Sequence, residues 1–214
     1  MSGLGGPLCA AWKALCGRIG APEEPVRRVG DRVAAGYQQS GRHYHDLEHI
    51  EEVLATLDLL RAAGEPVADP VAVEFAAWFH DLVYRPGADD NEARSAELAR
   101  SCLLELGAGV ELADRASALV LATADHRPRS QDEALLVDAD LAILGASTDR
   151  YVRYVADIRA EYAHVDEVDW RRGRSAVLAD LLARDPLYRT RSLRDQREER
   201  ARANLRAELD RLAG

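Results

Sequence analysis

Five of the six histidines in this chain fall in three short segments, and each segment also carries an acidic residue. The segments are RHYHDLEH at 42–49, WFHD at 78–81 and TADH at 123–126. A further acidic segment, DADLAILG, follows at 138–145. Imidazole and carboxylate together are donors that proteins use for zinc, manganese, iron and magnesium, and for acid–base catalysis. The clustering therefore indicates a metal site or a buried network of His–Asp hydrogen bonds.

His80 and Asp81 close an apolar run, residues 71–79, that is stable only when it is buried. A buried imidazole needs a partner. That partner is either a hydrogen bond to Asp81 or a nearby carbonyl, or a metal ion. Because no cysteine lies in any of these segments, the oxygen and nitrogen donors favour a hydrated, catalytic metal over a structural zinc site.

Asp140 lies on the apolar side of a further predicted helix. It shares a helical period with the apolar positions Leu136, Ile143 and Leu144. An unpaired buried carboxylate is costly, so a cation or a hydrogen-bond donor is expected to meet Asp140. Asp138 lies about 200° away around the helix axis and is a candidate for a supporting role only.

His45 and His49 are four residues apart and are predicted to share one face of a helix that begins near His45. Taken alone, such a pair is typical of two exposed histidines. Together with His80 and Asp140, it indicates that three helices each present a His or an Asp to one place. His164 stands alone near the end of a predicted helix, where a structural role fits it better.

The order of these residues is itself a motif. His49 and His80 are 31 positions apart, and Asp81 precedes Asp140 by 59. This order, H…HD…D, resembles the HD superfamily of metal-dependent phosphohydrolases. Four longer blocks, RHYHDLEHI, WFHDLVY, DNEARSAELA and LLVDADLAILG, resemble a bacterial branch described as predicted HD phosphohydrolases. The resemblance covers about residues 37–165, which is most of the chain.

The resemblance implies four metal ligands, namely His49, His80, Asp81 and Asp140. It also implies that Asp81 is a catalytic residue that is able to bridge two ions. The expected cofactor is accordingly one or two divalent cations, with Mn, Mg, Zn, Fe, Ni and Co as candidates. The YHxxxH block is similar to that of helical cyclic-nucleotide phosphodiesterases. This likeness implies that His45 donates a proton to the leaving oxygen while His49 holds the metal.

Two further positions acquire candidate roles from the same resemblance. His126 lies where some HD enzymes place an additional histidine near the phosphate or a second metal. Glu92 belongs to the NExxSA block and is a candidate base or water ligand, whereas Asn91 could equally be only a helix cap.

Three arginines lie beside the histidine segments, Arg42, Arg85 and Arg127. A guanidinium can orient phosphate oxygens with two parallel hydrogen bonds. Surface charge is an equally good interpretation of each arginine. Arg85 stands where the branch often has an acidic residue. A cation at this position favours an anionic substrate, but it cannot perform a role that requires an acid. Arg42 and Arg85 are kept as candidate substrate-binding residues.

Apolar residues recur with a helical period along nearly the whole chain, and the alternation typical of strands is hard to find. We therefore predict a compact all-α fold of about nine or ten helices, and the resemblance implies that these helices form an HD-domain-like bundle. Glycine and proline separate the helices. The expected ranges are 8–17, 23–39, 45–63, 70–84, 91–106, 110–125, 131–144, 148–163, 166–184 and 194–212.

The 214 residues are 47% hydrophobic and 30% charged, a globular composition for which we expect a single domain over 1–214. The resemblance implies that this domain is of the HD type. Its core is expected at about 23–165, with C-terminal helices at 166–212 packing on it. The formal net charge is −9. This charge repels a polyanion and argues against binding to duplex nucleic acid.

The remaining composition bears on location and partners. No apolar run approaches the roughly 18 residues that cross a bilayer, so no membrane association is expected, and no secretory signal is recognisable. The three cysteines form no CxxC pair, which argues against a disulfide framework and favours the cytoplasm. A small phosphorylated substrate is the expected partner. The sequence leaves open whether the chain forms a homodimer.

Two functions compete on these grounds. The first is a metal-dependent phosphohydrolase that acts on a small phosphorylated metabolite or a nucleotide. The alternative is a regulatory module that binds a metal or a nucleotide without turnover. The first is favoured, because the implied ligands and the implied proton donor are all present. A diiron oxygenase on a related scaffold would need additional histidine ligands, and only His126 is available for that role.

Overall fold

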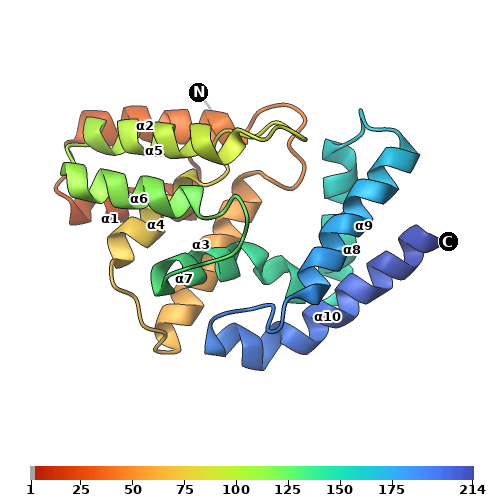
Figure 1. Ribbon diagram of the computed structural model, residues 1–214. Helices are drawn as coiled ribbons and strands as arrows, with labels where there is room; N and C mark the ends of the chain where they lie inside the picture. The colour runs from red at the N-terminus through yellow and green to blue at the C-terminus, as the bar shows by residue number, and fades with distance from the viewer. Residues whose placement is uncertain (1–2) are drawn as a thin grey trace.

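The computed structural model of the chain describes residues 3–214 and contains helices and turns, with no strand in that range. The predicted all-α class is confirmed (Figure 1). No helix of the described residues is long and apolar enough to cross a membrane. The helices in chain order are α1 (Gly6–Arg18), α2 (Glu23–Tyr37), α3 (Leu47–Ala62), α4 (Pro70–Phe79), α5 (Asn91–Glu105), α6 (Val110–Leu121), α7 (Gln131–Asp140), the 3-10 helix η1 (Leu141–Gly145), α8 (Thr148–Glu161), α9 (Glu167–Ala183) and α10 (Arg191–Ala213).

Helix α4 lies at the centre of the N-terminal part of the molecule. Its sequence, PVAVEFAAWF, is apolar on nearly every side, as expected for a helix that others enclose. It contacts α1, α3, α5, α6 and α7. Trp12 of α1 packs edge to face against α4, with its ring centroid 5.4 Å from that of Trp78. This packing holds the end of α4, from which His80 and Asp81 project.

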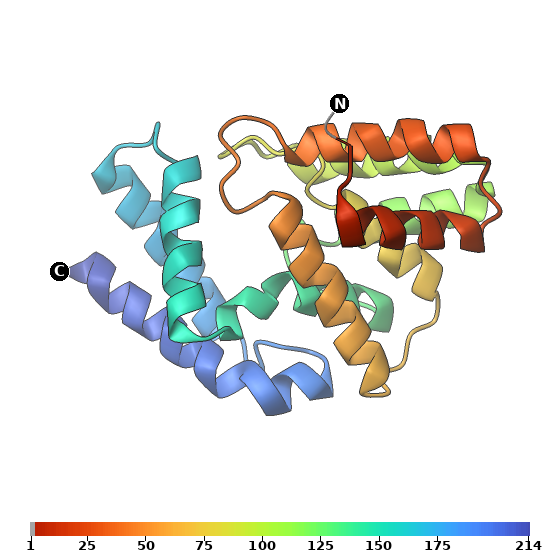
Figure 2. The ribbon, with the colours of Figure 1, turned by 180° about the vertical axis from the view of Figure 1, so that it is seen from behind.

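Helices α8, α9 and α10 form a second group that stands apart from α1, α2, α5 and α6 in both views (Figures 1 and 2). Helix α10 packs against α9 and η1. A buried ion pair links this group, since Arg174 of α9 donates to Glu208 of α10 at 2.7 Å and Tyr151 of α8 donates to the same carboxylate. One hydrophobic cluster runs from Leu8 to Leu205 and joins both groups.

Several helix ends beside the candidate site differ from the prediction. Helices α6 and α7 end at Leu121 and Asp140, although the sequence pattern predicts that they continue to about 125 and 144. The predicted helix start at His45 is wrong, because Asp46 is the N-cap and its carboxylate accepts hydrogen bonds from the backbone N–H groups of Glu48 and His49. The predicted continuation of α4 to about residue 84 is also wrong, since the helix ends at Phe79. His45 and the residues after Asp81 therefore lie in turns, where helical periodicity does not determine the directions of the side chains.

Asp138 serves the fold, and its candidate supporting role at the site is wrong. Its carboxylate accepts hydrogen bonds from the backbone N–H groups of Arg189 at 3.0 Å and Thr190 at 2.6 Å. These bonds tie α7 to the segment that leads into α10. Burial of the Asp138 carboxyl raises its pKa to about 6 against the opposing effect of these two donors.

Candidate metal centre

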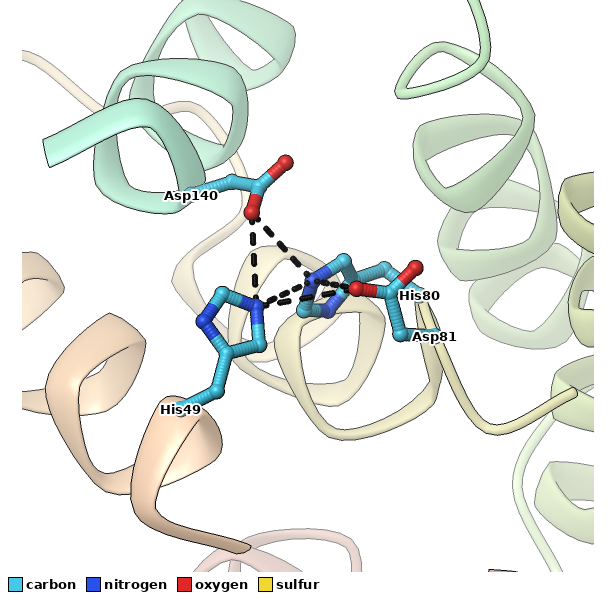
Figure 3. A group of neighbouring side chains, drawn as sticks. All are labelled: His49, His80, Asp81 and Asp140. Atoms are coloured by element: carbon cyan, nitrogen blue, oxygen red, sulfur yellow. Dashed lines mark hydrogen bonds and ion pairs between the residues drawn. The ribbon is translucent and has the colours of Figure 1, made fainter. Parts of the chain in front are cut away.

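Four side chains that are far apart in the sequence meet between α3, α4 and α7. His49 lies in the first turn of α3, His80 and Asp81 follow the last residue of α4, and Asp140 is the last residue of α7. One ligand atom from each residue lies within 4.8 Å of the corresponding atoms of the other three (Figure 3). This group could hold a metal ion, as the sequence predicts.

The separations between these atoms suit ligands of a single cation. The Nε2 atom of His80 lies 3.1 Å from Nε2 of His49 and 3.1 Å from Oδ2 of Asp81. Nε2 of His49 lies 3.3 Å from Oδ1 of Asp140. Neighbouring ligands of an octahedral ion with bonds of about 2.1 Å are about 3 Å apart. A divalent cation therefore fits among these atoms with small adjustments.

A hydrogen bond from the ring nitrogen that faces away from the cluster fixes the orientation of His80. Its Nδ1 lies 2.9 Å from the backbone carbonyl of Ala77, to which it donates a hydrogen bond. The proton on Nδ1 leaves Nε2 as a lone pair directed at the cluster, which is the usual arrangement of a metal-binding histidine. His49 and His80 are both only 1% exposed. His49 Nδ1 is buried with no hydrogen-bond partner in the described chain.

The field inside the cluster attracts positive charge. Burial opposes protonation of His80, but the carboxylates of Asp81 and Asp140 outweigh burial and raise its pKa well above the ordinary value. Burial likewise opposes ionisation of Asp81 and Asp140, yet the adjacent imidazoles hold the pKa of both carboxyls well below the usual range. Two ionised carboxylates in a buried site require compensation, which a proton or a divalent cation can provide.

His126 adds a second contact to Asp140. Its Nε2 donates to Oδ2 of Asp140 at 3.0 Å, while Oδ1 of the same carboxylate faces the other ligands. His126 has a backbone φ of 49°, an unusual conformation for a residue other than glycine. Arg184 of α9 donates to the carbonyl of His126 at 2.7 Å. The structure thus places His126 beside the predicted ligands, where it orients Asp140.

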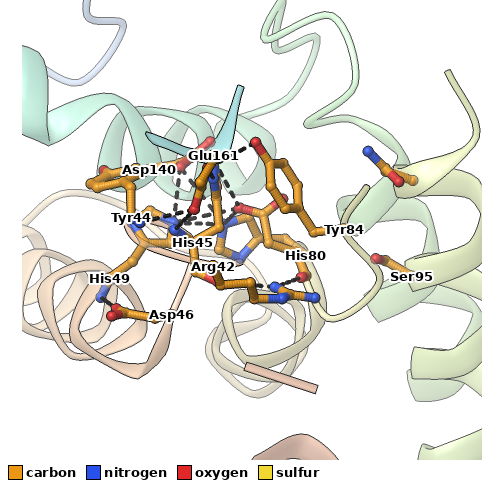
Figure 4. Close-up of polar contacts among 12 residues, drawn as sticks. Arg42, Tyr44, His45, Asp46, His49, His80, Tyr84, Ser95, Asp140 and Glu161 are labelled. Atoms are coloured by element: carbon orange, nitrogen blue, oxygen red, sulfur yellow. Dashed lines mark hydrogen bonds and ion pairs between the residues drawn. The ribbon is translucent and has the colours of Figure 1, made fainter. Parts of the chain in front are cut away.

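His45 lies beside the cluster and is held by Glu161, which the sequence analysis did not identify (Figure 4). The Nδ1 atom of His45 donates to Oε2 of Glu161 at 2.7 Å. The ring stacks on Tyr84, with centroids 4.0 Å apart, and the Tyr84 hydroxyl donates to the same oxygen of Glu161 at 2.9 Å. Nε2 of His45 lies 4.0 Å from Oδ2 of Asp81. One ring nitrogen is therefore anchored while the other lies next to the candidate metal ligands.

Glu161 is itself fully enclosed. Its other oxygen, Oε1, accepts hydrogen bonds from the backbone N–H groups of three consecutive residues, His43, Tyr44 and His45, at 2.8 to 2.9 Å. Burial opposes ionisation, but the bonds from His45 and from this backbone lower the pKa of Glu161 to about 2. Glu161 is therefore a carboxylate that shapes the turn before α3 and orients His45 at once.

A signal for Glu161 was present in the sequence. Glu161 falls on the same side of α8 as Tyr151, Tyr154 and Ile158, all of which are buried. This is the pattern by which Asp140 was identified, an acid at the helical period of an apolar face. The pattern predicts that such an acid needs a partner, but it does not identify the partner as a residue more than a hundred positions away.

Arg42, a candidate substrate-binding residue, contacts the backbone of the two turns beside the cluster. Its guanidinium donates to three backbone carbonyls, those of His45 at 3.0 Å, Asp81 at 2.7 Å and Leu82 at 2.8 Å. It also lies over the rings of Tyr37 and Tyr84. Arg42 thus joins the turn that carries His45 to the turn that carries Asp81. Both of its terminal nitrogens donate to backbone carbonyls, whereas its buried Nε has no hydrogen-bond partner among the described residues.

The other two arginines lie outside the site. Arg85 is exposed and pairs with Asp90 at 2.6 Å, and Arg127 is exposed and pairs with Asp180 at 2.5 Å. Neither lines the cavity that opens onto the cluster. The surface-charge interpretation fits both residues in this structure.

The NExxSA block holds the turn that follows Asp81. The side-chain amide of Asn91 accepts from the backbone N–H of Arg85 and donates to its carbonyl, and the Ser95 hydroxyl bonds both backbone groups of Val83. The helix-cap interpretation of Asn91 is wrong, because Asp90 is the N-cap and the Asn91 side chain binds the backbone of Arg85 instead. Glu92 lines the cavity beside the cluster, which is compatible with its predicted role.

A cavity of about 760 Å³ opens onto these residues. His45, Asp81, Glu92, His126 and Asp140 line one side of it, and α8 and α9 line the other. Its volume lies within the range of about 300–1,000 Å³ that is usual for small-molecule sites. The candidate metal centre is therefore accessible to a small molecule from the side that His45 faces.

A scan against protein-family models and searches of curated proteins and of solved structures returned no match to this chain. The resemblance to the HD superfamily accordingly depends on the sequence motifs alone.

Proposed function

We propose that this chain is a metal-dependent phosphohydrolase of the HD type, which hydrolyses a phosphate ester or pyrophosphate bond of a small metabolite or nucleotide. One observation carries the proposal. Two imidazole nitrogens and two carboxylate oxygens lie within 4.8 Å of one another beside an open cavity, with an anchored histidine next to them. This combination provides ligands for a cation, space for a substrate and a group that can transfer a proton.

His49, His80, Asp81 and Asp140 would hold the cation. A bound divalent ion lowers the pKa of water and offsets charge on phosphoryl oxygens, and these effects are what phosphoester hydrolysis needs. The chain supplies a dry, shaped wall around the ligands, since both histidines are buried and His126 keeps Asp140 in position.

His45 is the proposed proton donor to the leaving oxygen. Its Nδ1–H bond to Glu161 leaves Nε2 to carry the proton that is transferred. Imidazole is the side chain that enzymes use most often for general acid catalysis. The stacking on Tyr84 limits rotation of the ring. The proton is therefore held at Nε2, on the side of the ring nearest Asp81.

The alternative is a metal- or nucleotide-binding module without turnover. A module of that kind needs the ligands but has no use for an anchored proton donor. The His45–Glu161 pair, built from the turn before α3 and the end of α8, therefore favours the hydrolase.

The test is a hydrolysis panel with the protein purified without chelator and supplied with Mn²⁺, Mg²⁺, Ni²⁺ or Co²⁺. We expect turnover of at least one phosphoester or pyrophosphate by the wild type. His45→Ala should lower kcat by about 10²- to 10⁴-fold while bound metal is nearly unchanged. His43→Ala is the matched control, because its exposed side chain is removed while its backbone bond to Glu161 stays.

Two outcomes would count against this assignment. Equal hydrolysis by the wild type and His45→Ala would show that His45 is not the proton donor. Bound metal without hydrolysis of any phosphoester would move the assignment to the binding module.

A further inference from the structure

The wall of the cavity opposite the metal centre is one face of α9. It contains an aromatic ring, Trp170, and small or apolar residues at helical spacing, Gly173, Ala176, Val177 and Leu181. Tyr154 and Tyr162, from α8 and the turn after it, continue the aromatic surface. The metal centre is polar, whereas apolar and aromatic residues make up most of this wall, which also carries the charged residues Asp169, Arg174 and Asp180. The cavity is therefore suited to a molecule with two chemically different ends.

Gly173 indicates that the space beside α9 is kept open. Glycine in a helix interior is unfavourable relative to alanine. Gly30 in α2 has a packing reason, since an added Cβ would lie 2.9 Å from Nε1 of Trp12. Gly173 has no such reason, because an added Cβ would meet no atom within 4 Å. A side chain at position 173 would instead enter the cavity, so the glycine preserves volume there.

The charges around the cavity bear on the length of a phosphate chain. The two arginines that line it are Arg174 and Arg184. Arg174 is buried and bound to Glu208 at 2.7 Å, and Arg184 is bound to Asp180 at 2.7 Å and to the carbonyl of His126. Each arginine in the described lining is therefore already paired with an acidic residue. The cavity is thus poorly suited to several successive phosphates.

We infer that the face of α9 around Trp170 and Gly173 binds the alcohol portion of a phosphate monoester, and that this portion carries a planar ring. The inference depends on the proposed function for the position of the phosphate at the metal centre. Aromatic walls bind planar rings by stacking, with centroid separations that leave room for offset or edge-on geometry. The ring would lie in the space that Gly173 leaves open, against the part of Trp170 that Arg159 and Tyr162 leave uncovered.

The test compares substrates of different shape with Mn²⁺-loaded protein. The ring-bearing monoesters are 1-naphthyl phosphate and adenosine 5′-monophosphate, the small monoester is glycerol phosphate, and the polyphosphate is ATP. We expect kcat/KM for the ring-bearing monoesters to exceed that for glycerol phosphate by about 10-fold or more, which is the effect of one stacked ring. ATP should be a poorer substrate than adenosine 5′-monophosphate.

Two variants of α9 separate this subsite from the metal chemistry. Gly173→Leu fills the open space and should lower kcat/KM for the ring-bearing esters by about 10-fold, chiefly through KM, while glycerol phosphate stays within about 2-fold. Ala179→Leu is the matched control, since Ala179 is exposed on α9 and does not line the cavity. It should leave both classes of substrate unchanged.

A binding measurement keeps the subsite testable if no ester is hydrolysed. 1-Naphthylphosphonate, which has no ester bond, is titrated against the fluorescence of Trp170, with Trp170→Phe to identify its signal among the three tryptophans. Quenching that is lost in Gly173→Leu supports the subsite even where the proposed function fails. Equal kcat/KM for naphthyl and glycerol phosphates, with no effect of Gly173→Leu on turnover or quenching, would overturn the subsite and leave the proposed function standing.

Discussion

The carboxylate of Glu161 accepts a hydrogen bond from Nδ1 of His45 at 2.7 Å, across 116 positions of the sequence. Through this bond the end of α8 determines how a side chain before α3 faces the metal ligands. The same carboxylate binds three backbone N–H groups of that turn. Helix α8 is therefore part of the site and not only a wall of the cavity.

Replacing Glu161 by glutamine tests its role in orienting His45. The amide keeps a similar shape but loses the charge that stabilises an imidazolium on His45. We expect Glu161→Gln to lower kcat by about 10-fold or more, with KM and bound metal nearly unchanged. Glu199→Gln, an exposed change on α10, is the control. A variant that loses metal instead of kcat would show that Glu161 supports the ligands.

The pH dependence of stability provides a second test of Glu161. Its pKa in the folded protein is about 2, below the ordinary 4.5. A depressed folded pKa means that ionised Glu161 stabilises the fold above pH 4.5, and that this stabilisation is lost as the pH falls toward 2. The difference in unfolding free energy between wild type and Glu161→Gln should shrink by about 2 kcal/mol from about pH 6 to about pH 3.

Urea unfolding of both proteins at each pH measures this difference. A difference that stays constant over this range would show that the Glu161 carboxyl is not held in its ionised form by the fold.

Arg42 distinguishes a positioning role from a substrate-binding role. Its guanidinium donates to the carbonyls of His45, Asp81 and Leu82, so Arg42→Ala leaves buried carbonyls without donors. We expect the unfolding free energy to fall by about 2–4 kcal/mol and Mn²⁺ affinity to fall by about 10-fold, because Asp81 is less well held. Isothermal titration with Mn²⁺ and chemical unfolding measure the two effects.

Arg42→Lys is the companion variant, because it keeps the charge but not the forked geometry. If Arg42 bound the phosphate of the substrate, these variants would raise KM while Mn²⁺ affinity and stability stayed at the wild-type values.

Much of the candidate site was predictable because burial and chain geometry constrain it locally. His80 and Asp81 end an apolar helix, and Asp140 lies on the apolar side of α7, so each had to face the interior. His45 lies beside the cluster as predicted, but the reason given, a helical face shared with His49, is wrong. His45 precedes the N-cap Asp46 and shares no helical face with His49, although both approach the same cluster.

The parts that were missed depend on contacts between distant segments. Nothing local in the sequence says that Glu161 faces the turn before α3, that Arg42 binds the carbonyls after α4, or that Gly173 faces a cavity. Local periodicity says that a residue is buried, but the partner it meets is set by the packing of whole helices.

The central claim is that His49, His80, Asp81 and Asp140 together bind a divalent cation, and calorimetric titration of chelator-treated protein with Mn²⁺ tests it most directly. We predict that the wild type and His164→Ala, whose ring stacks on Tyr162 outside the cluster, bind one or two ions per chain, and more weakly as the pH falls because protons compete for the histidines. His80→Ala and Asp140→Asn should lose at least about 100-fold in affinity. Equal Mn²⁺ binding by all four proteins, or no binding by the wild type at neutral pH, would contradict the account.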